Sequence, residues 1–185
     1  VVRLVPKEAD KYGFVLWVDE QSHLLLRVDM VDKEGNLVEQ VLGVDLDRQP
    51  APAPWLVTLA RSKLPDALAL EDAYPAPQQT LNWHLTWLPG GFKVLSQDRH
   101  QLVSTSLPVD YMMLSDGVVD LSVYVSRVDP KQAVRQQLIR QGATSLVSFV
   151  NEVGVEITVV GEVPTETAKR IAESVQPLAR NEAVQ

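Results

Sequence analysis

The chain has 185 residues, of which 45% are hydrophobic, so it can bury a sizeable core and is not broadly disordered. Its formal net charge of −7 argues against a nucleic-acid-binding surface, which needs clustered positive charge. Because it contains no cysteine, disulfides, thiolate catalysis and cysteine zinc sites are excluded.

The first part of the chain has the alternation of antiparallel strands. Apolar and other residues alternate between Tyr12 and Val18 and again between Leu24 and Val31, and turn residues follow each run. We expect three strands between Lys11 and Leu46. Both faces of the first two strands are partly apolar, so either a second element covers one face or the strands line an apolar cavity. The residues that would line such a cavity are Phe14, Leu16, Trp17 and Leu26.

Two proline-rich segments, at residues 49–54 and 74–79, interrupt the middle of the chain. Proline supplies no backbone N–H, so neither segment forms a central strand or a helix interior. Between them, apolar residues at helical spacing predict a short helix that ends before Pro65. We therefore expect a first domain over residues 1–48, a linker over 49–80 and a second domain over 81–185.

The second domain is predicted to be a mixed sheet-and-helix unit. Its expected strands cover residues 82–88, 91–96, 109–115, 118–128, 143–150 and 155–162. Ser115-Asp116-Gly117 is typical of a hairpin turn, since Asp accepts local backbone bonds and Gly tolerates positive φ. The buried face of this domain is expected to include Trp83 and Trp87.

Two helices are predicted in the same domain. One follows Asp129-Pro130, and the other follows Pro164 with Thr165 as its N-cap and ends before Pro177. The apolar residues assigned to the first helix are Ala133, Val134, Leu138 and Ile139. Those assigned to the second are Ala168, Ile171, Ala172 and Val175.

No group of residues has the pattern of a catalytic or metal site. The three histidines lie in different predicted elements without metal-ligand spacing. Ser115 lacks a nucleophile elbow, and Gly90-Gly91 is followed by neither the lysine nor the helix of a phosphate loop. Asp110, Asp116 and Asp120 cluster in the sequence and could include an acid–base pair, but Asp116 is better explained by its turn and Asp120 by the polar face of its strand. We expect no enzyme activity, no metal and no cofactor.

Several segments together resemble one known family. They are Tyr12–Asp19, Leu26–Asp29, Trp83-x-x-x-Trp87-Leu88-Pro89-x-Gly91-Phe92, Tyr111-x-x-x-Ser115-Asp116-Gly117, and Ile157–Pro164 running into Thr167–Glu173. Each motif is weak alone, but their order and spacing are similar to those of the RseB/MucB family, over nearly the whole chain.

The resemblance implies a mainly β (α+β) protein. The first part would be the end of an open β-barrel like that of lipoprotein carriers, followed by the linker and a smaller mixed domain. About 46 residues precede the linker, too few to form such a barrel, so we expect the chain to be a fragment.

The resemblance also implies a function. Members are periplasmic negative regulators of the envelope-stress response. They bind the periplasmic part of a membrane-spanning anti-sigma factor of the RseA/MucA type and protect it from regulated proteolysis, and lipopolysaccharide or lipid signals relieve that protection. The alternative is a periplasmic lipid or lipoprotein carrier, and self-association into a homo-oligomer is a further expectation.

Partner contacts are expected to be apolar and aromatic. The expected contact residues are Trp55, Leu59, Tyr74, Met112, Met113 and Tyr124. The first three lie in the linker, which holds more large apolar side chains than a passive tether needs. Met112 and Met113 could alternatively be core residues.

Overall fold

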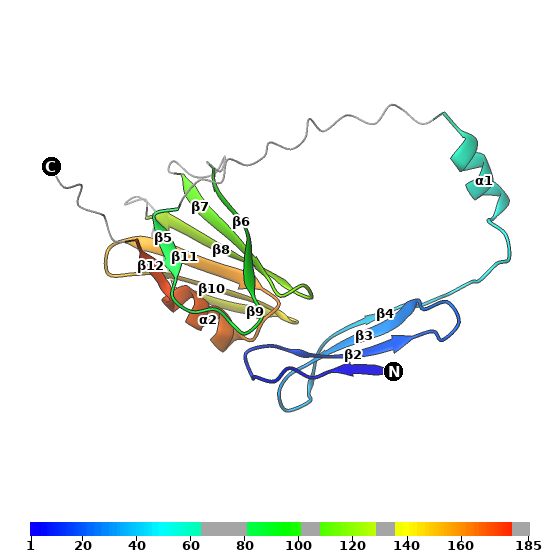
Figure 1. Cartoon of the computed structure of the whole chain (residues 1–185), viewed down its shortest axis with the longest axis horizontal. Coiled ribbons are helices and arrows are strands. Elements are labelled where there is room, and N and C mark those ends of the chain that lie inside the picture. Colours follow the sequence, from blue (N-terminus) through cyan, green and yellow to red (C-terminus); the bar gives the residue numbers. More distant parts are fainter. Residues whose placement is uncertain (64–80, 101–107, 129–135, 179–185) are drawn as a thin grey trace.

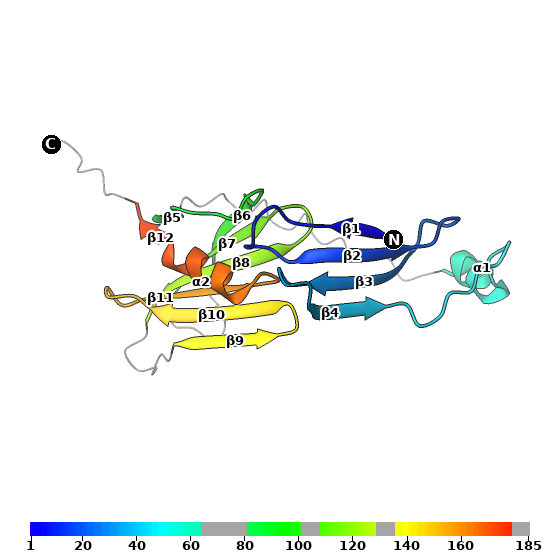
Figure 2. The same ribbon diagram turned by 90° about the horizontal axis from the view of Figure 1, so that it is seen from below.

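The computed structural model describes residues 1–63, 81–100, 108–128 and 136–178 (Figure 1). This part of the chain is mainly β, as the sequence predicts, and it contains three antiparallel sheets and two helices. None of these sheets closes on itself within the described residues. The first sheet lies beside one end of the second domain, and Figure 2 shows the same arrangement from below.

The first sheet is a four-stranded meander in the order β1-β2-β3-β4. Its strands are β1 (Val2–Leu4), β2 (Gly13–Val18), β3 (Leu25–Val31) and β4 (Leu37–Leu42). The turn before β4 forms because Asp32 Oδ1 accepts the backbone N–H groups of Glu34 and Asn36. The sequence predicts the last three strands. β4 ends earlier than expected, at Leu42, because the chain leaves the sheet after the Gly43 N–H donates to the Leu26 carbonyl.

The two faces of this sheet differ in chemistry. Phe14 lies opposite Met30 on one face, and this apolar face packs against the second domain. On the other face the Arg27 guanidinium carbon lies 4.3 Å from the centre of the Trp17 ring and the side chain pairs with Asp29. Gln40 Nε2 donates to Asp29 Oδ1 at 2.9 Å. The second face is therefore covered by its own cation–π contact and polar network.

The second domain is built on a six-stranded antiparallel sheet in the order β6-β7-β8-β11-β10-β9. Its strands are β6 (Lys93–His100), β7 (Val109–Ser115), β8 (Asp120–Arg127), β9 (Gln137–Gln141), β10 (Thr144–Val150) and β11 (Val155–Gly161). A two-stranded ribbon of β5 (Trp83–Leu85) and β12 (Val175–Pro177) and the helix α2 (Thr165–Glu173) complete it. The other helix, α1 (Pro54–Arg61), belongs to the linker.

The core lies between the sheet and α2 (Figure 2). Ala168, Ile171 and Ala172 of α2 are fully buried, which confirms most of the stripe predicted from helical spacing. Alternate residues of β8 are buried on the same side of the sheet, as predicted. Trp83 is buried with them, whereas Trp87 is half-buried beneath Arg170, whose guanidinium carbon lies 3.9 Å from the ring centre.

The hairpin turn predicted at Ser115-Asp116-Gly117 is confirmed. Asp116 Oδ1 accepts the backbone N–H groups of Val118 and Val119 at 3.0 and 3.1 Å. Gly117 has a φ of 88°, which side-chain-bearing residues rarely adopt. This turn joins β7 to β8 at the end of the sheet that faces the first sheet.

The structure corrects the helix predicted around Leu138 and Ile139. Both residues lie in β9, where they pair with Val147 and Leu146 of β10. Two adjacent apolar residues fit a helix or a strand equally well, and the pairing with β10 decides for the strand. Ala133 and Val134, assigned to the same helix, lie outside the described residues.

Two details of α2 also differ from expectation. Pro164 occupies the N-cap position without a side-chain cap bond, and Thr165 Oγ1 lies 3.1 Å from Ser145 Oγ of β10 instead. The helix ends at Glu173, and Ser174 Oγ donates to the Ile171 carbonyl at 2.7 Å. Val175 therefore starts β12 rather than continuing the helix, because pairing with β5 draws it into a strand.

Candidate functional site

Within the described ranges, no three His, Asp or Glu side chains are grouped to hold a metal ion. The helices described there are too short to cross a lipid bilayer. Two of the sequence candidates for acid–base chemistry, Asp110 and Asp116, have structural partners. The Asp110 carboxylate accepts hydrogen bonds from Arg99 Nε at 2.5 Å, Arg99 Nη2 at 3.1 Å and Trp83 Nε1 at 3.0 Å. These donors tie β5 and β6 to β7 beside a cavity of about 430 Å³.

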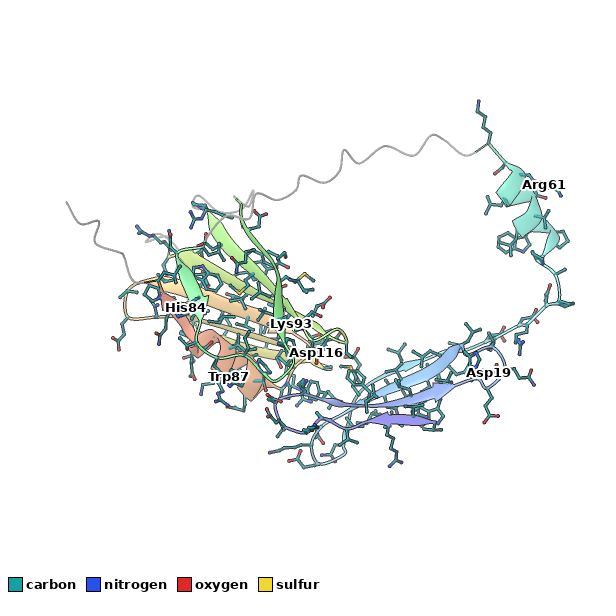
Figure 3. The ribbon with its side chains drawn as sticks, viewed as in Figure 1. Asp19, Arg61, His84, Trp87, Lys93 and Asp116 are labelled. Carbon is teal, nitrogen blue, oxygen red and sulfur yellow. The ribbon has the colours of Figure 1, made fainter. Side chains whose placement is uncertain are left out.

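The linker helix α1 presents apolar side chains to solvent. None of its residues is buried, and Trp55 and Leu59 are 66% and 50% exposed. Figure 1 shows α1 apart from both sheets, and Figure 3 places Arg61 at its far end. An exposed aromatic residue beside exposed leucines is typical of a surface that a partner covers. Tyr74, the third linker candidate, lies outside the described residues.

The remaining candidates are divided between the two faces of β7 and β8. On the face opposite α2, Tyr111 lies across from Tyr124, with ring centres 5.2 Å apart, and Met113 lies across from Ser122. Met113 and Tyr124 are half-buried there. Met112 points to the other face and is 2% exposed. The structure therefore assigns Met112 to the core instead of to a contact surface, because successive residues of a strand point to opposite faces.

Of the four predicted cavity residues, Phe14 alone lines the cavity described beside the first sheet. This cavity of about 590 Å³ is lined by Phe14 and Leu4 among others, but not by Leu16, Trp17 or Leu26. Trp17 lies on the opposite face from Phe14, beneath Arg27. Leu16 and Leu26 are half-buried elsewhere in the sheet.

The junction between the first sheet and the second domain was not predicted. Lys11 Nζ donates to the Gly90 carbonyl at 2.7 Å and to Asp116 Oδ2 at 3.2 Å. The same ammonium group lies 5.8 Å from the centre of the Phe92 ring. Figure 3 shows Asp116 at the end of the second domain nearest to the first sheet. Lys11 therefore contacts two loops of the second domain. It makes a hydrogen bond and a cation–π contact with the β5–β6 loop and an ion pair with the β7–β8 turn.

Two further contacts fix the same junction. Thr167 Oγ1 of α2 donates to the Asp10 carbonyl at 2.9 Å. The backbone N–H of Ala143 donates to Glu39 Oε2 of β4 at 2.9 Å. Tyr12 and Met30 of the first sheet are buried in one apolar cluster with the second domain's core. No local pattern signals these contacts, because the partners are 104 to 157 residues apart in the sequence.

The Lys11–Asp116 pair makes the stability of the junction depend on pH. Burial raises the pKa of the Asp116 carboxyl, but the N–H groups of Val119 and Val118 and the Lys11 ammonium lower it, so the net pKa lies below its ordinary value of 3.8. A carboxyl whose pKa is lower in the folded state stabilises the fold above the unfolded pKa. That stabilisation is lost as pH falls through the folded pKa.

We expect Asp116→Asn to lower the free energy of unfolding by about 1–2 kcal/mol at neutral pH. Asn keeps the oxygen that accepts the turn N–H groups but loses the charge that faces Lys11. The difference from the natural chain should shrink below pH 3.8. Urea unfolding across this pH range tests it, with Asp120→Asn, an exposed strand position, as the matched control. Equal pH profiles for the natural chain and Asp116→Asn would contradict it.

Comparison with known proteins finds two matching family models. A model described as the MucB/RseB N-terminal domain matches residues 1–68, and one described as the MucB/RseB C-terminal domain matches residues 77–176. The sigma-E factor regulatory protein RseB of Escherichia coli K12 is 33% identical over 177 residues, covering 95% of this chain and 54% of that protein. The sigma factor AlgU regulatory protein MucB of Pseudomonas aeruginosa is 29% identical over 187 residues, covering 97% and 56%. The chain thus spans about half the length of these relatives.

Solved structures also match this chain to MucB. The crystal structure of MucB in complex with MucA(peri) matches with a TM-score of 0.73 and 27% identity, covering 94% of this chain and 60% of that one. The complex structure of Pseudomonas aeruginosa MucA/MucB matches with a TM-score of 0.74 and 28% identity, covering 96% and 59%. Because the C-terminal family model alone matches more than half of its residues, this chain belongs to the MucB/RseB family.

Proposed function

We propose that the chain acts in a periplasmic negative regulator that binds the periplasmic domain of a membrane-spanning anti-sigma factor and shields it from regulated proteolysis. The observation that carries the proposal is the match to MucB solved together with MucA, over 94% and 96% of this chain. The names of the curated relatives, sigma-E factor regulatory protein and sigma factor AlgU regulatory protein, support it.

The proposed organisation has three parts. Residues 1–48 form the end of an open β-barrel like that of lipoprotein carriers, residues 49–80 form the linker, and residues 81–185 form the interaction domain. Support comes from the meander of β1 to β4, and from the first sheet and the six-stranded sheet falling on either side of α1. The boundary between the two matched family models also lies inside the proposed linker, between residues 68 and 77.

Binding in this proposal depends on burying apolar and aromatic surface. The exposed side chains of α1 supply one contact region, with Trp55 as its anchor. Tyr124 and Met113, on the sheet face opposite α2, supply a second. Such interfaces owe most of their affinity to a few buried aromatic or aliphatic anchors.

A periplasmic lipid or lipoprotein carrier is the second candidate. The observation that favours it is the cavity of about 590 Å³ beside the first sheet, whose lining includes the apolar Phe14, Leu4 and Val31 as well as charged residues such as Lys7 and Glu34. A pull-down with a MucA-type periplasmic domain and a fluorescent-lipid binding assay separate the two functions. The regulator proposal expects retention of the periplasmic domain. Lipid binding without any such retention would favour the carrier.

Trp55→Ala and Leu59→Ala should each weaken partner binding. An interface anchor of this kind contributes about 2 kcal/mol, or roughly thirtyfold in affinity. The melting temperature should not change, because neither side chain is buried in the fold. Tyr74→Ala, outside the described residues, is a third variant with the same expectation.

Calorimetric titration with the partner's periplasmic domain, alongside a thermal melt of each variant, checks this prediction. Thr58→Ala, on the same exposed helix, is the matched control. A lowered melting temperature with normal affinity would mean that α1 only stabilises its own chain.

A further inference from the structure

The outer strand β9 of the six-stranded sheet exposes its whole length. Among the described residues it pairs with β10 alone, and each of its five residues is exposed. Leu138 and Ile139, which point to opposite faces of the sheet, are 59% and 52% exposed. An outer strand with apolar side chains on both faces is a template for another strand.

The hairpin that precedes β10 determines which backbone groups of β9 face outward. Its loop has two residues, Gly142 and Ala143, and Gly142 has a φ of 58° at the first position, as in a type II′ turn. In such a hairpin the flanking residues Gln141 and Thr144 form two backbone hydrogen bonds with each other, N–H to C=O in both directions. Every second pair along the two strands, such as Ile139 and Leu146, is bonded in the same way. The N–H and C=O groups of Leu138 and Arg140 therefore point away from β10.

Within the described residues, this edge has neither a proline nor a bulge, two of the devices that prevent strand addition. Its single charged side chain, Arg140, folds back along the hairpin, where Nε donates to the Gly142 carbonyl at 3.2 Å. Natural proteins protect their outer strands in these ways unless the edge is used.

The edge continues into the first sheet. β4 is the outer strand of that sheet, and Leu37, Val41 and Leu42 are exposed along it. Figure 2 shows β9 and β4 following one another on the same side of the molecule, with their arrows in the same direction. The hydrogen bond from the Ala143 N–H to Glu39 Oε2 joins the end of the β9–β10 hairpin to β4.

We propose that an extended segment of the anti-sigma factor's periplasmic domain pairs antiparallel with β9, through the outward groups of Leu138 and Arg140, and continues along β4. This inference rests on the proposed function and adds the binding mode. A second copy of β9 offers five residues and then a turn, so it would cover β9 alone, whereas one extended peptide covers both outer strands. Backbone pairing provides affinity, and alternate side chains reach Leu138 and Ile139. A segment held in this way is withheld from a protease that also binds extended chains.

Amide hydrogen exchange measured by NMR tests this pairing. In the free 185-residue chain, the Leu138 and Arg140 amides should exchange rapidly, while the Ile139 amide, bonded to β10, exchanges more slowly. A saturating MucA-type periplasmic domain should slow exchange at Leu138 and Arg140 by at least about tenfold and slow part of β4 as well. Binding without this protection overturns the inference and leaves the proposed function intact.

The free chain provides a further outcome. If exchange at Leu138 and Arg140 slows as the concentration of the free chain rises, a second copy pairs with β9, and this result also overturns the inference.

A pair of variants gives an independent test. Leu138→Pro removes an outward N–H while leaving the β10 ladder complete, which outer strands tolerate. It should weaken binding by about tenfold or more, whereas Leu138→Thr, which keeps the N–H, should stay within about threefold. Equal affinities for the two variants overturn the inference. If Leu138→Pro lowers the melting temperature, Arg140→Pro replaces it as the backbone variant. Absence of any binding by the natural chain would remove both this inference and the function on which it rests.

Discussion

An isolated fragment of residues 81–185 is expected to melt cooperatively, whereas residues 1–48 alone should show no cooperative transition. The first sheet has few buried apolar residues of its own. Tyr12 and Met30 are buried, and both belong to the cluster that includes the second domain's core. Phe14 and Val38 also pack against that cluster. Without the second domain these side chains would face water, and a small sheet with one exposed apolar face is not stable alone.

The second domain keeps its core when the first sheet is removed. Its fully buried apolar side chains include Leu114, Leu121, Val123, Ile157, Val159 and Ile171, all contributed by the sheet and α2. A domain of about 100 residues is long enough to fold on such a core. Differential scanning calorimetry of both fragments checks the prediction. A soluble, monomeric fragment of residues 1–48 with a cooperative melt would contradict it, as would a fragment of residues 81–185 without one.

Ile171→Ala should destabilise the natural chain by about 2–5 kcal/mol, since it removes three carbon atoms from a fully buried position and leaves a cavity. Ile171 lies between Ala168 and Ala172 on the face of α2 that covers the sheet, and two small neighbours cannot fill the space. For a domain of this size the melting temperature should fall by at least about 10 °C.

Lys169→Ala is the matched control on the same helix. Lys169 is exposed, and its described ion pair, with Glu173 at 4.0 Å, is solvent-accessible. Its removal should change the free energy of unfolding by less than about 0.5 kcal/mol. If Ile171→Ala melted within about 2 °C of the natural chain, α2 would not be packed on the sheet as described.

Elements with a strong local signal could be predicted from the sequence. The alternating apolar residues Val119, Leu121, Val123 and Val125 predict β8, the Ser-Asp-Gly turn predicts its start, and the apolar stripe predicts α2. For the segment of β9 the sequence wrongly predicts a helix, because the apolar residues Leu138 and Ile139 fit the period of a helix as well as that of a strand. The Gly142 turn, which reverses the chain, and the pairing with β10 that follows from it make this segment a strand. Val175 was assigned to α2 for a similar reason, since its partner Leu85 is 90 positions earlier.

The candidate surfaces were predictable in part. The spacing alone could have placed Met112 in the core. Met112 and Leu114 are two residues apart in β7, so they share one face of the sheet, and both are buried there. The helix at Trp55 follows from its apolar spacing, but its exposure does not, because the same spacing also suits a helix packed on a sheet. The Lys11–Asp116 junction had no signal, since it depends on how two sheets meet.

Calorimetric titration of a MucA-type periplasmic domain into the natural chain and into residues 49–185 decides where the affinity lies. We expect saturable binding by both, with dissociation constants within about tenfold of each other, because the contacts that we propose lie mostly in the linker and the second domain. A fragment of residues 49–185 that melts cooperatively and yet gives no binding heat, while the natural chain binds, would contradict this.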